Sequence, residues 1–274
     1  MITADFHTHT AFSSDSEAEP GQMIERAIRL GLKTLCITDH YDHLFPEQYG
    51  LPFTFDPEEY FARLGECREK YCGQITLLCG VELGLRDEPD ILPQCAAFYR
   101  ALAERYPFDF VIGSTHVLSH TDPYYPEYWD KRPCSEGLKD YFSAVETAVQ
   151  SYDCFQVYGH LDYLVRYLPG ENKNYCLPDF ADRIDRILKL LIERGAGIEL
   201  NTAGWRYGLP FAHPRAEILL RYRELGGEIL TVGSDAHAPE QLAGDFDRAA
   251  KLLRSLGFRY YTVFRERRPE FLPL

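Results

Sequence analysis

The sequence lacks an excess of positive charge, and it lacks any long apolar run. It has 29 Lys and Arg residues against 42 Asp and Glu residues, which gives a formal net charge of -13 at pH 7. Nucleic acids and anionic membrane surfaces are bound through basic patches, so this balance argues against both kinds of partner. No stretch approaches the ~20 apolar residues of a membrane span. Because the first predicted strand begins at residue 2, we expect no signal peptide and a cytoplasmic protein.

Paired cysteines are also missing. The eight cysteines are scattered, and none of them forms a Cys-x-x-Cys pair. Disulfide frameworks and cysteine-based zinc sites use short, regular spacings. We therefore interpret these residues as reduced thiols in the core.

The sequence does contain a regular alternation of apolar strands and amphipathic helices. The predicted strands are 2–6, 34–38, 75–81, 108–112, 154–158, 198–200 and 229–232. The predicted helices are 20–30, 56–71, 91–106, 138–151, 181–194, 215–225 and 239–256, and a last strand at 260–264 could close or flank the sheet. Seven such units predict parallel strands with right-handed crossovers. With no internal repeat or linker, residues 1–274 are expected to form one domain.

Polar residues that can bind metals follow six of these seven strands. They are His7, His9, Asp15, Asp39, His40, Glu82, His116, His160, Asp162, Asp235 and His237, and the polar residue Asn201 follows the remaining strand. An open sheet would scatter them, because neighbouring strands lie ~4.8 Å apart. A barrel instead brings all strand ends to one rim, where barrel enzymes keep their active sites. The distribution therefore favours an α/β fold of the TIM-like barrel type.

Two features make a metal site the favoured interpretation. His7 and His9 follow a strand at positions i and i+2, so their imidazoles should point to the same side. Glu82 ends an apolar strand, where a buried carboxylate is costly unless it is paired or bound to a metal. A single His-x-His motif is more often accidental than functional. Six successive strands that deliver histidines and carboxylates to one rim are hard to obtain by chance. Mixed His and carboxylate ligation suits Zn, Mn or Fe.

The motifs resemble those of the PHP (polymerase and histidinol phosphatase) superfamily. In chain order they are His7-Thr8-His9, Thr38-Asp39-His40, Gly80-Val81-Glu82, His116, Gly159-His160-Leu161-Asp162 and Gly233-Ser234-Asp235-Ala236-His237. Phe12-Ser13-Ser14-Asp15 and Glu199-Leu200-Asn201-Thr202 look most like the monofunctional histidinol-phosphatases of this superfamily. The resemblance covers nearly the whole chain.

This resemblance implies a distorted (β/α)7 barrel with three divalent metal ions. One ion would take His7, His9, Glu82 and Asp235, and a second would share Glu82 and add His116 and His160. The third would take Asp15, His40 and His237. Asp39, Asp162 and Asn201 are expected to act as hydrogen-bond partners of the ligands, or merely to hold the loops.

The implied activity is hydrolysis of L-histidinol phosphate in histidine biosynthesis, through attack by a metal-bound hydroxide. A phosphate group favours guanidinium partners, so Arg166 and Arg206, which follow two of the motifs, are expected to bind it. His43 is a candidate proton donor or substrate contact, and His120 and His213 are weaker candidates. The predicted catalytic set is therefore Glu82, Asp235, His237, Arg166, Arg206 and His43.

The loop Ser119–Cys134 is a candidate lid or substrate wall, and Glu17 and Tyr41 could help to hold the cationic end of the substrate. One alternative is a phosphoesterase of the same kind that acts on a sugar phosphate or nucleotide. A nuclease is disfavoured by the missing basic stripe. An amidohydrolase-like barrel is disfavoured because no lysine ends a strand, where it could be carboxylated to bridge metal ions. A degenerate, non-catalytic metal-binding module is disfavoured because none of the expected ligands is missing. Metal identity and oligomeric state cannot be read from the sequence.

Overall fold

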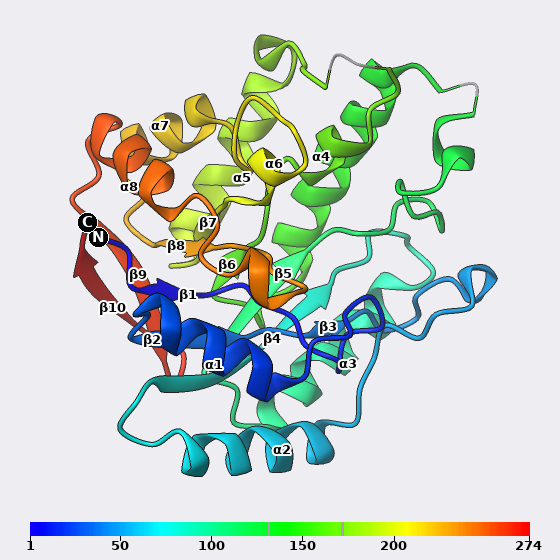
Figure 1. Cartoon of the computed structure of the whole chain (residues 1–274). Helices are drawn as coiled ribbons and strands as arrows, with labels where there is room; N and C mark the ends of the chain where they lie inside the picture. Colours follow the sequence, from blue (N-terminus) through cyan, green and yellow to red (C-terminus); the bar gives the residue numbers. More distant parts are fainter. Residues whose placement is uncertain (131, 171–172) are drawn as a thin grey trace.

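The chain folds into a barrel of parallel strands surrounded by helices (Figure 1). The computed structural model describes residues 1–130, 132–170 and 173–274. Its strands are β1 (Ala4–Asp5), β2 (Thr34–Ile37), β3 (His40–Tyr41), β4 (Thr76–Gly84), β5 (Phe110–Ser114), β6 (Val157–Tyr158), β7 (Gly197–Asn201), β8 (Leu230–Gly233), β9 (Tyr260–Arg265) and β10 (Arg268–Pro273). Its α-helices are α1 (Pro20–Leu30), α2 (Pro57–Lys70), α3 (Leu92–Arg105), α4 (Cys134–Ser151), α5 (Ala181–Glu193), α6 (Ala203–Arg206), α7 (Ala216–Glu224) and α8 (Phe246–Ser255). The short 3₁₀ helices are η1 (Glu47–Tyr49), η2 (Pro126–Trp129), η3 (Tyr163–Tyr167), η4 (Leu177–Phe180) and η5 (Pro239–Gln241).

Within the described residues, seven strands form the barrel wall in the order β1-β2-β4-β5-β6-β7-β8, and all neighbours are parallel. The chain just after β1 meets the end of β8 and brings the two edges together. Phe6 N donates to Val232 O (3.1 Å), and Asp235 N donates to His7 O (2.8 Å). The predicted TIM-like (β/α)7 barrel is confirmed.

The helix ends follow local sequence signals. Pro20 occupies the first turn of α1, where its missing N–H is not needed. Gly31 ends the helix with a left-handed φ of 77°, a conformation that glycine adopts without strain. Met23, Ile24 and Ala27 are buried on one face of α1. This is the amphipathic pattern expected of a helix that packs on the outside of a barrel.

Two parts of the chain differ from the sequence prediction. The expected continuous helix over 239–256 is wrong, because η5 and α8 are separated by a turn in which Ala243 and Asp245 have left-handed φ values of 53° and 58°. Ala243 N donates to Asp5 Oδ2 there (3.0 Å), so this turn is fastened to β1. The third strand is also longer than predicted, and Glu82 therefore lies within β4 and pairs with His40 of the short strand β3.

The last strand flanks the barrel rather than closing it. β9 pairs with β10 in an antiparallel hairpin, which Figure 1 shows beside the N-terminal strand. Thr3 N donates to Tyr261 OH (3.2 Å) and ties the hairpin to the start of the chain. The predicted loop Ser119–Cys134 is irregular apart from η2, and its residue 131 lies outside the described part. Among the described residues, no helix has the length and apolar character needed to cross a membrane.

Candidate metal centre

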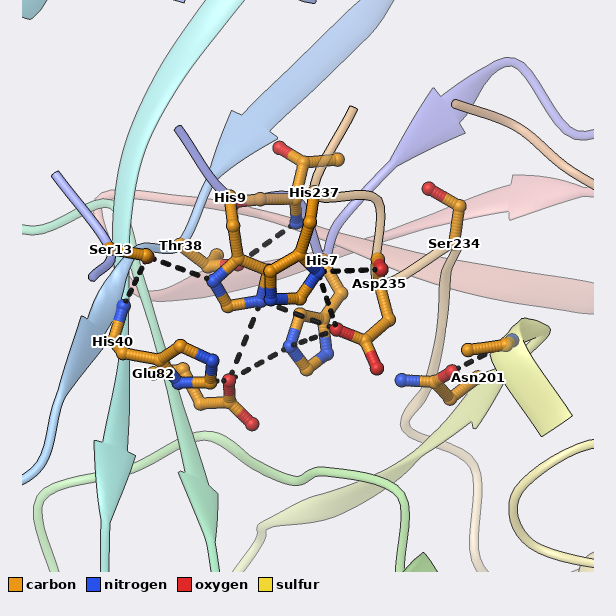
Figure 2. Close-up of polar contacts among 12 residues, drawn as sticks. His7, His9, Ser13, Thr38, His40, Glu82, Asn201, Ser234, Asp235 and His237 are labelled. Carbon is orange, nitrogen blue, oxygen red and sulfur yellow. Dashed lines mark hydrogen bonds and ion pairs between the residues drawn. The ribbon is translucent and has the colours of Figure 1, made fainter. Parts of the chain in front are cut away.

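Glu82 lies in the middle of the site, on β4, and Figure 2 shows His7 and His9 in contact with one oxygen of its carboxylate. Imidazole nitrogens lie within 3.6 Å of its oxygens: those of His7, His9 and His40 at Oε2, and those of His116 and His160 at Oε1. Burial alone would raise the pKa of Glu82, but the charges of the surrounding histidines hold this pKa well below its ordinary value. A carboxylate that faces two groups of imidazoles is arranged to bridge two metal ions.

His7 and His9 point to the same side, as their i and i+2 spacing predicts. Their Nε2 atoms lie 3.0 and 3.6 Å from Glu82 Oε2, and 3.8 and 3.4 Å from Asp235 Oδ1. The junction between β1 and β8 causes this convergence. Asp235 N donates to His7 O (2.8 Å), and His9 N donates to Ala236 O (2.8 Å). The first and the seventh strands of the barrel therefore place their side chains in one group.

Oxygen atoms behind the histidines fix the orientation of the rings. His7 Nδ1 donates to Glu199 Oε1 (2.7 Å), and His116 Nδ1 donates to Asp42 Oδ2 (2.8 Å). A carboxylate can only accept a hydrogen bond, so both rings carry a proton on Nδ1. Their Nε2 lone pairs then point toward Glu82, which is the tautomer that a metal ion requires.

His9 is oriented in the same way through Ser13. Ser13 Oγ donates its single proton to Asp39 Oδ1 (2.6 Å), so it accepts at its other contacts. Its donors are His9 Nδ1 (3.2 Å) and His40 N (3.0 Å). Asp39 also accepts from Thr10 N (2.6 Å) and thus fastens the loop after β1. Asp39 therefore orients His9 through the hydroxyl of Ser13 and does not contact the imidazole directly.

Asp15, His40 and His237 form the outer part of the site. Asp15 Oδ2 is 3.6 Å from His40 Nε2 and 3.3 Å from His237 Nε2. The rings of His40 and His237 both lie close to His9, with centroids 4.2 and 4.1 Å from its ring and 5.7 Å from each other. These three candidate ligands, from the turn after β1, from β3 and from the loop after β8, are therefore adjacent to the inner group but closer to the solvent.

The donor atoms fit divalent metal ions. His7 Nε2, His9 Nε2, His40 Nδ1 and Glu82 Oε2 are buried and have no hydrogen-bond partner in the described part of the chain. A buried polar atom without a partner costs about 1–3 kcal/mol, and several of them at one point would be strongly unfavourable. Bound metal ions remove this cost, because the lone pairs are then used in coordination. Ligand atoms gather within 4.8 Å of one another in two predicted combinations: His7, His9 and Glu82; and Glu82, His116 and His160. A third group of this kind, His9, His40 and His237, contains two of the three residues predicted for the third ion, with His9 in place of Asp15.

A pocket of about 440 Å³ opens over the metal-binding residues, and Arg166 forms part of its wall. The guanidinium lies 4.1, 5.0 and 4.6 Å from the ring centroids of Tyr163, Tyr167 and Tyr207. Its Nη1 is 3.7 Å from Asp235 Oδ2, and its Nε is buried and has no hydrogen-bond partner among the described residues. Arg166 is therefore a fixed cation beside the candidate metal ligands.

The remaining predicted residues lie away from this pocket. Arg206 donates to the carbonyls of Ser234 (2.8 Å) and Asp235 (2.7 Å), so its guanidinium holds the backbone of a metal-binding loop. The ring of His43 stacks on Phe98, with centroids 3.8 Å apart, and it does not line the pocket. The structure thus places Arg166 beside the predicted ligands, whereas His43 lies away from them.

His120 and His213 are not among the pocket residues either. His120 Nε2 lies 3.6 Å from Asp90 Oδ1 at the surface. His213 is buried, and its Nδ1 donates to Asp162 Oδ1. Asp162 therefore fastens the loop around His213 instead of contacting a metal ligand. Asn201 Nδ2 donates to Glu199 Oε2 (3.2 Å), so Asn201 acts one step behind His7.

Glu199 and Asp42 are the two carboxylates that accept from His7 and His116 and that the sequence reasoning did not single out as such. Glu199 lies in the buried strand β7. A buried carboxylate in an apolar strand was the signal that identified Glu82, and the same signal was present for Glu199. Asp42 follows His40 by two residues, and nothing in the sequence indicates that it faces His116.

The fold and the site together define a class: β/α-barrel proteins with clustered histidines and carboxylates, able to bind metal ions, at the carboxyl ends of the barrel strands. The PHP domain family model matches residues 5–203. The chain belongs to the PHP family.

Several relatives align with almost the whole chain. The histidinol-phosphatase of Lactococcus lactis is 29% identical over 272 residues, covering 96% of this chain and 95% of its own length. A relative from Clostridium acetobutylicum is 30% identical over 267 residues, covering 96% of this chain and 97% of its own. A crystal structure of the Lactococcus lactis enzyme, with zinc, L-histidinol and phosphate, superposes with a TM-score of 0.87 at 26% identity and covers 98% of both chains.

Proposed function

We propose that this chain is a metal-dependent phosphatase that hydrolyses L-histidinol phosphate to L-histidinol and phosphate, a step of histidine biosynthesis. The observation that carries this proposal is the Glu82 carboxylate between two groups of inward-facing imidazoles, with Arg166 beside them. The names of the full-length relatives and the contents of the Lactococcus lactis structure support the choice of substrate.

The nine ligands are assigned to three divalent ions. The sets are His7, His9, Glu82 and Asp235; Glu82, His116 and His160; and Asp15, His40 and His237. The contacts around Glu82 support the first two sets, and the contacts of Asp15 support the third. Zn, Mn and Fe all suit this donor set, and the zinc in the Lactococcus lactis structure favours Zn. When bound, such ions lower the pKa of a coordinated water and neutralise the charge of the phosphate oxygens.

The chain's own residues position the substrate. Arg166 binds a phosphate oxygen through its guanidinium, and the rings of Tyr163 and Tyr207 beside the guanidinium limit the access of water to this contact. Arg206 keeps the carbonyls of Ser234 and Asp235 in place, so the Asp235 carboxylate stays directed at the ligands of β1. Catalysis in this site depends on positioning and charge, and no side-chain nucleophile is required.

The proposed enzyme is one phosphatase domain over residues 1–274, and we place it in the cytoplasm. All eight cysteines are free in the structure, as expected in a reducing compartment, but Cys72, Cys134 and Cys176 are exposed and not in the core as the sequence predicted. The net charge of -13 supports a small phosphorylated substrate rather than a nucleic acid.

Phosphate release by the Zn- or Mn-loaded protein tests the proposal. Histidinol phosphate is compared with a panel of sugar phosphates and nucleotides, and kcat/KM is measured for each. We expect a preference of about a hundredfold for histidinol phosphate, which is about 2.7 kcal/mol of selective transition-state binding. Comparable values across the panel would discard histidinol phosphate as the dedicated substrate, and no release from any compound would overturn the assignment as a phosphatase.

A further inference from the structure

Four carboxylates line the pocket above the metal-binding residues, and they have different partners. Asp15 and Asp235 face histidines of the metal centre, and Asp42 accepts a hydrogen bond from His116. Asp122 is the fourth. Among the described residues, no lysine, arginine or histidine lies within ion-pair distance of it. One carboxylate of the wall therefore remains available for a cation that comes from outside the chain.

Asp122 is held firmly in this position. Its backbone N donates to Tyr49 OH (3.1 Å), and its Oδ1 accepts from Tyr124 N (2.8 Å). The ring of Tyr49 stacks on Tyr125, with centroids 4.0 Å apart and planes inclined by 7°. These contacts join the loop after β3 to the loop after β5 across the pocket wall. Because Oδ1 is used by the turn, Oδ2 is the oxygen left for a ligand.

A second anchor fixes the start of the same loop. Leu118 and Thr121 exchange two backbone hydrogen bonds of 2.9 Å. His120 N donates to Glu88 Oε1 (2.7 Å), and Glu88 is paired with the buried Arg86. The loop that carries Asp122 is thus fastened on both sides of this residue. A prepositioned carboxylate loses little conformational entropy when it binds a ligand.

The surroundings of Asp122 suit an organic cation with an aromatic group. Phe45, Phe53, Tyr124 and Tyr125 line the same pocket. Partial burial raises the pKa of Asp122 above its ordinary value, because the charged carboxylate is less well solvated there. A neighbouring cation would offset this cost. Neither Glu17 nor Tyr41, the residues suggested by the sequence for this role, is among the residues that line the pocket.

We propose that Asp122 determines substrate specificity by binding the ammonium group of the substrate, while Arg166 and the metal centre hold the phosphate at the other end. This inference rests on the proposed function, since L-histidinol phosphate carries an ammonium group, a phosphate and an imidazole ring. Asp122 touches no reacting atom, so its contribution is to binding and selection. The aromatic wall formed by Phe45 and Phe53 accommodates the imidazole ring.

The test compares three substrates in the native protein and in Asp122→Asn. They are histidinol phosphate, its deamino analogue 3-(imidazol-4-yl)propyl phosphate, and p-nitrophenyl phosphate. Asparagine keeps the oxygen that accepts from Tyr124 N, so the turn is retained. We expect kcat/KM for histidinol phosphate to fall by about 10- to 100-fold, mainly through KM, because a charge-assisted hydrogen bond is lost. The two substrates without an ammonium group should keep their rates.

Glu127→Gln is the matched control. Glu127 is an exposed carboxylate on η2 of the same loop and does not line the pocket. It should behave as the native protein toward all three substrates. An unchanged ratio of kcat/KM between histidinol phosphate and its deamino analogue in Asp122→Asn would overturn the inference alone. A parallel loss toward p-nitrophenyl phosphate would also overturn it, since this would show general damage to the site.

Measurements on the native protein distinguish failure of the Asp122 inference from failure of the proposed function. If the native protein hydrolyses p-nitrophenyl phosphate but shows no preference for histidinol phosphate over its deamino analogue, both the substrate assignment and the role of Asp122 are wrong. If the native protein has that preference and Asp122→Asn retains it, the function stands and only the role of Asp122 is rejected.

Discussion

Glu199 connects two metal-binding strand ends, and its replacement by glutamine tests how the histidines are oriented. Oε1 accepts from His7 Nδ1 (2.7 Å), and Oε2 accepts from His160 N (3.0 Å) and Asn201 Nδ2 (3.2 Å). In Glu199→Gln one of the two oxygens becomes an NH₂ group. Whichever way the amide is turned, a donor then faces another donor, either at His7 or at His160.

The expected magnitude follows from two independent ranges. A hydrogen bond to a charged group contributes about 1.5–3 kcal/mol. Loss of the outer partner of a metal-ligating histidine costs about 10- to 100-fold in metal affinity, which is about 1.4–2.7 kcal/mol. The ranges overlap, so we expect Glu199→Gln to bind zinc about 10- to 100-fold more weakly than the native chain.

The assay is a competition titration of the metal-free protein with a zinc-binding dye, together with far-UV circular dichroism. Glu193→Gln is the matched control, because Glu193 is exposed at the last turn of α5 and should leave zinc affinity unchanged. If Glu199→Gln binds zinc as tightly as the native chain and its spectrum is unchanged, then Glu199 does not support metal binding by orienting His7.

Two further predictions concern the centre and its packing. Glu82→Gln should lose most of its bound metal and most of its phosphatase activity while keeping the fold, because an amide cannot bridge two ions. Metal analysis and a phosphate-release assay measure these losses. Full activity of the variant would show that Glu82 does not bridge the ions. Gly233→Ala should lose metal affinity too, because an added Cβ would lie 2.3 Å from Glu199 Oε1 and from His7 Cβ. Gly65→Ala is its control, since the space around Gly65 on α2 is open. Alanine in this helix should raise the free energy of unfolding by about 0.5–1 kcal/mol, which a thermal melt measures. Equal zinc affinity in the two variants would contradict this packing argument.

The positions of the candidate metal ligands could be predicted from the sequence because they obey one rule. Each lies after the end of a predicted strand, and parallel strands in a barrel all end at the same rim. His7 and His9 illustrate how far the rule extends. The i and i+2 spacing correctly placed both imidazoles on one side, where both Nε2 atoms face Glu82. No knowledge of long-range contacts was needed for this step.

The outer partners could not be predicted in the same way, because they depend on contacts between distant strands. Asp42 and His116 are 74 residues apart, and their hydrogen bond is made across β3, β4 and β5. His43 shows the opposite error. It lies three residues after His40, but Leu44 has a left-handed φ of 61° and the chain turns there, so the ring of His43 packs on Phe98 instead of facing the pocket. Spacing along the chain does not reveal such a turn.

Arg206 shows how an arginine near the proposed phosphate site can stabilise the site through the backbone. Asp235 has a left-handed φ of 52°, which is unfavourable for a residue other than glycine. Its N donates to His7 O (2.8 Å), and its carbonyl accepts from Arg206 Nη2 (2.7 Å). These two contacts hold the peptide units on both sides of this residue. The strained backbone turns the Asp235 carboxylate toward His7 and His9, so the energy of these hydrogen bonds maintains the geometry of the metal-binding residues.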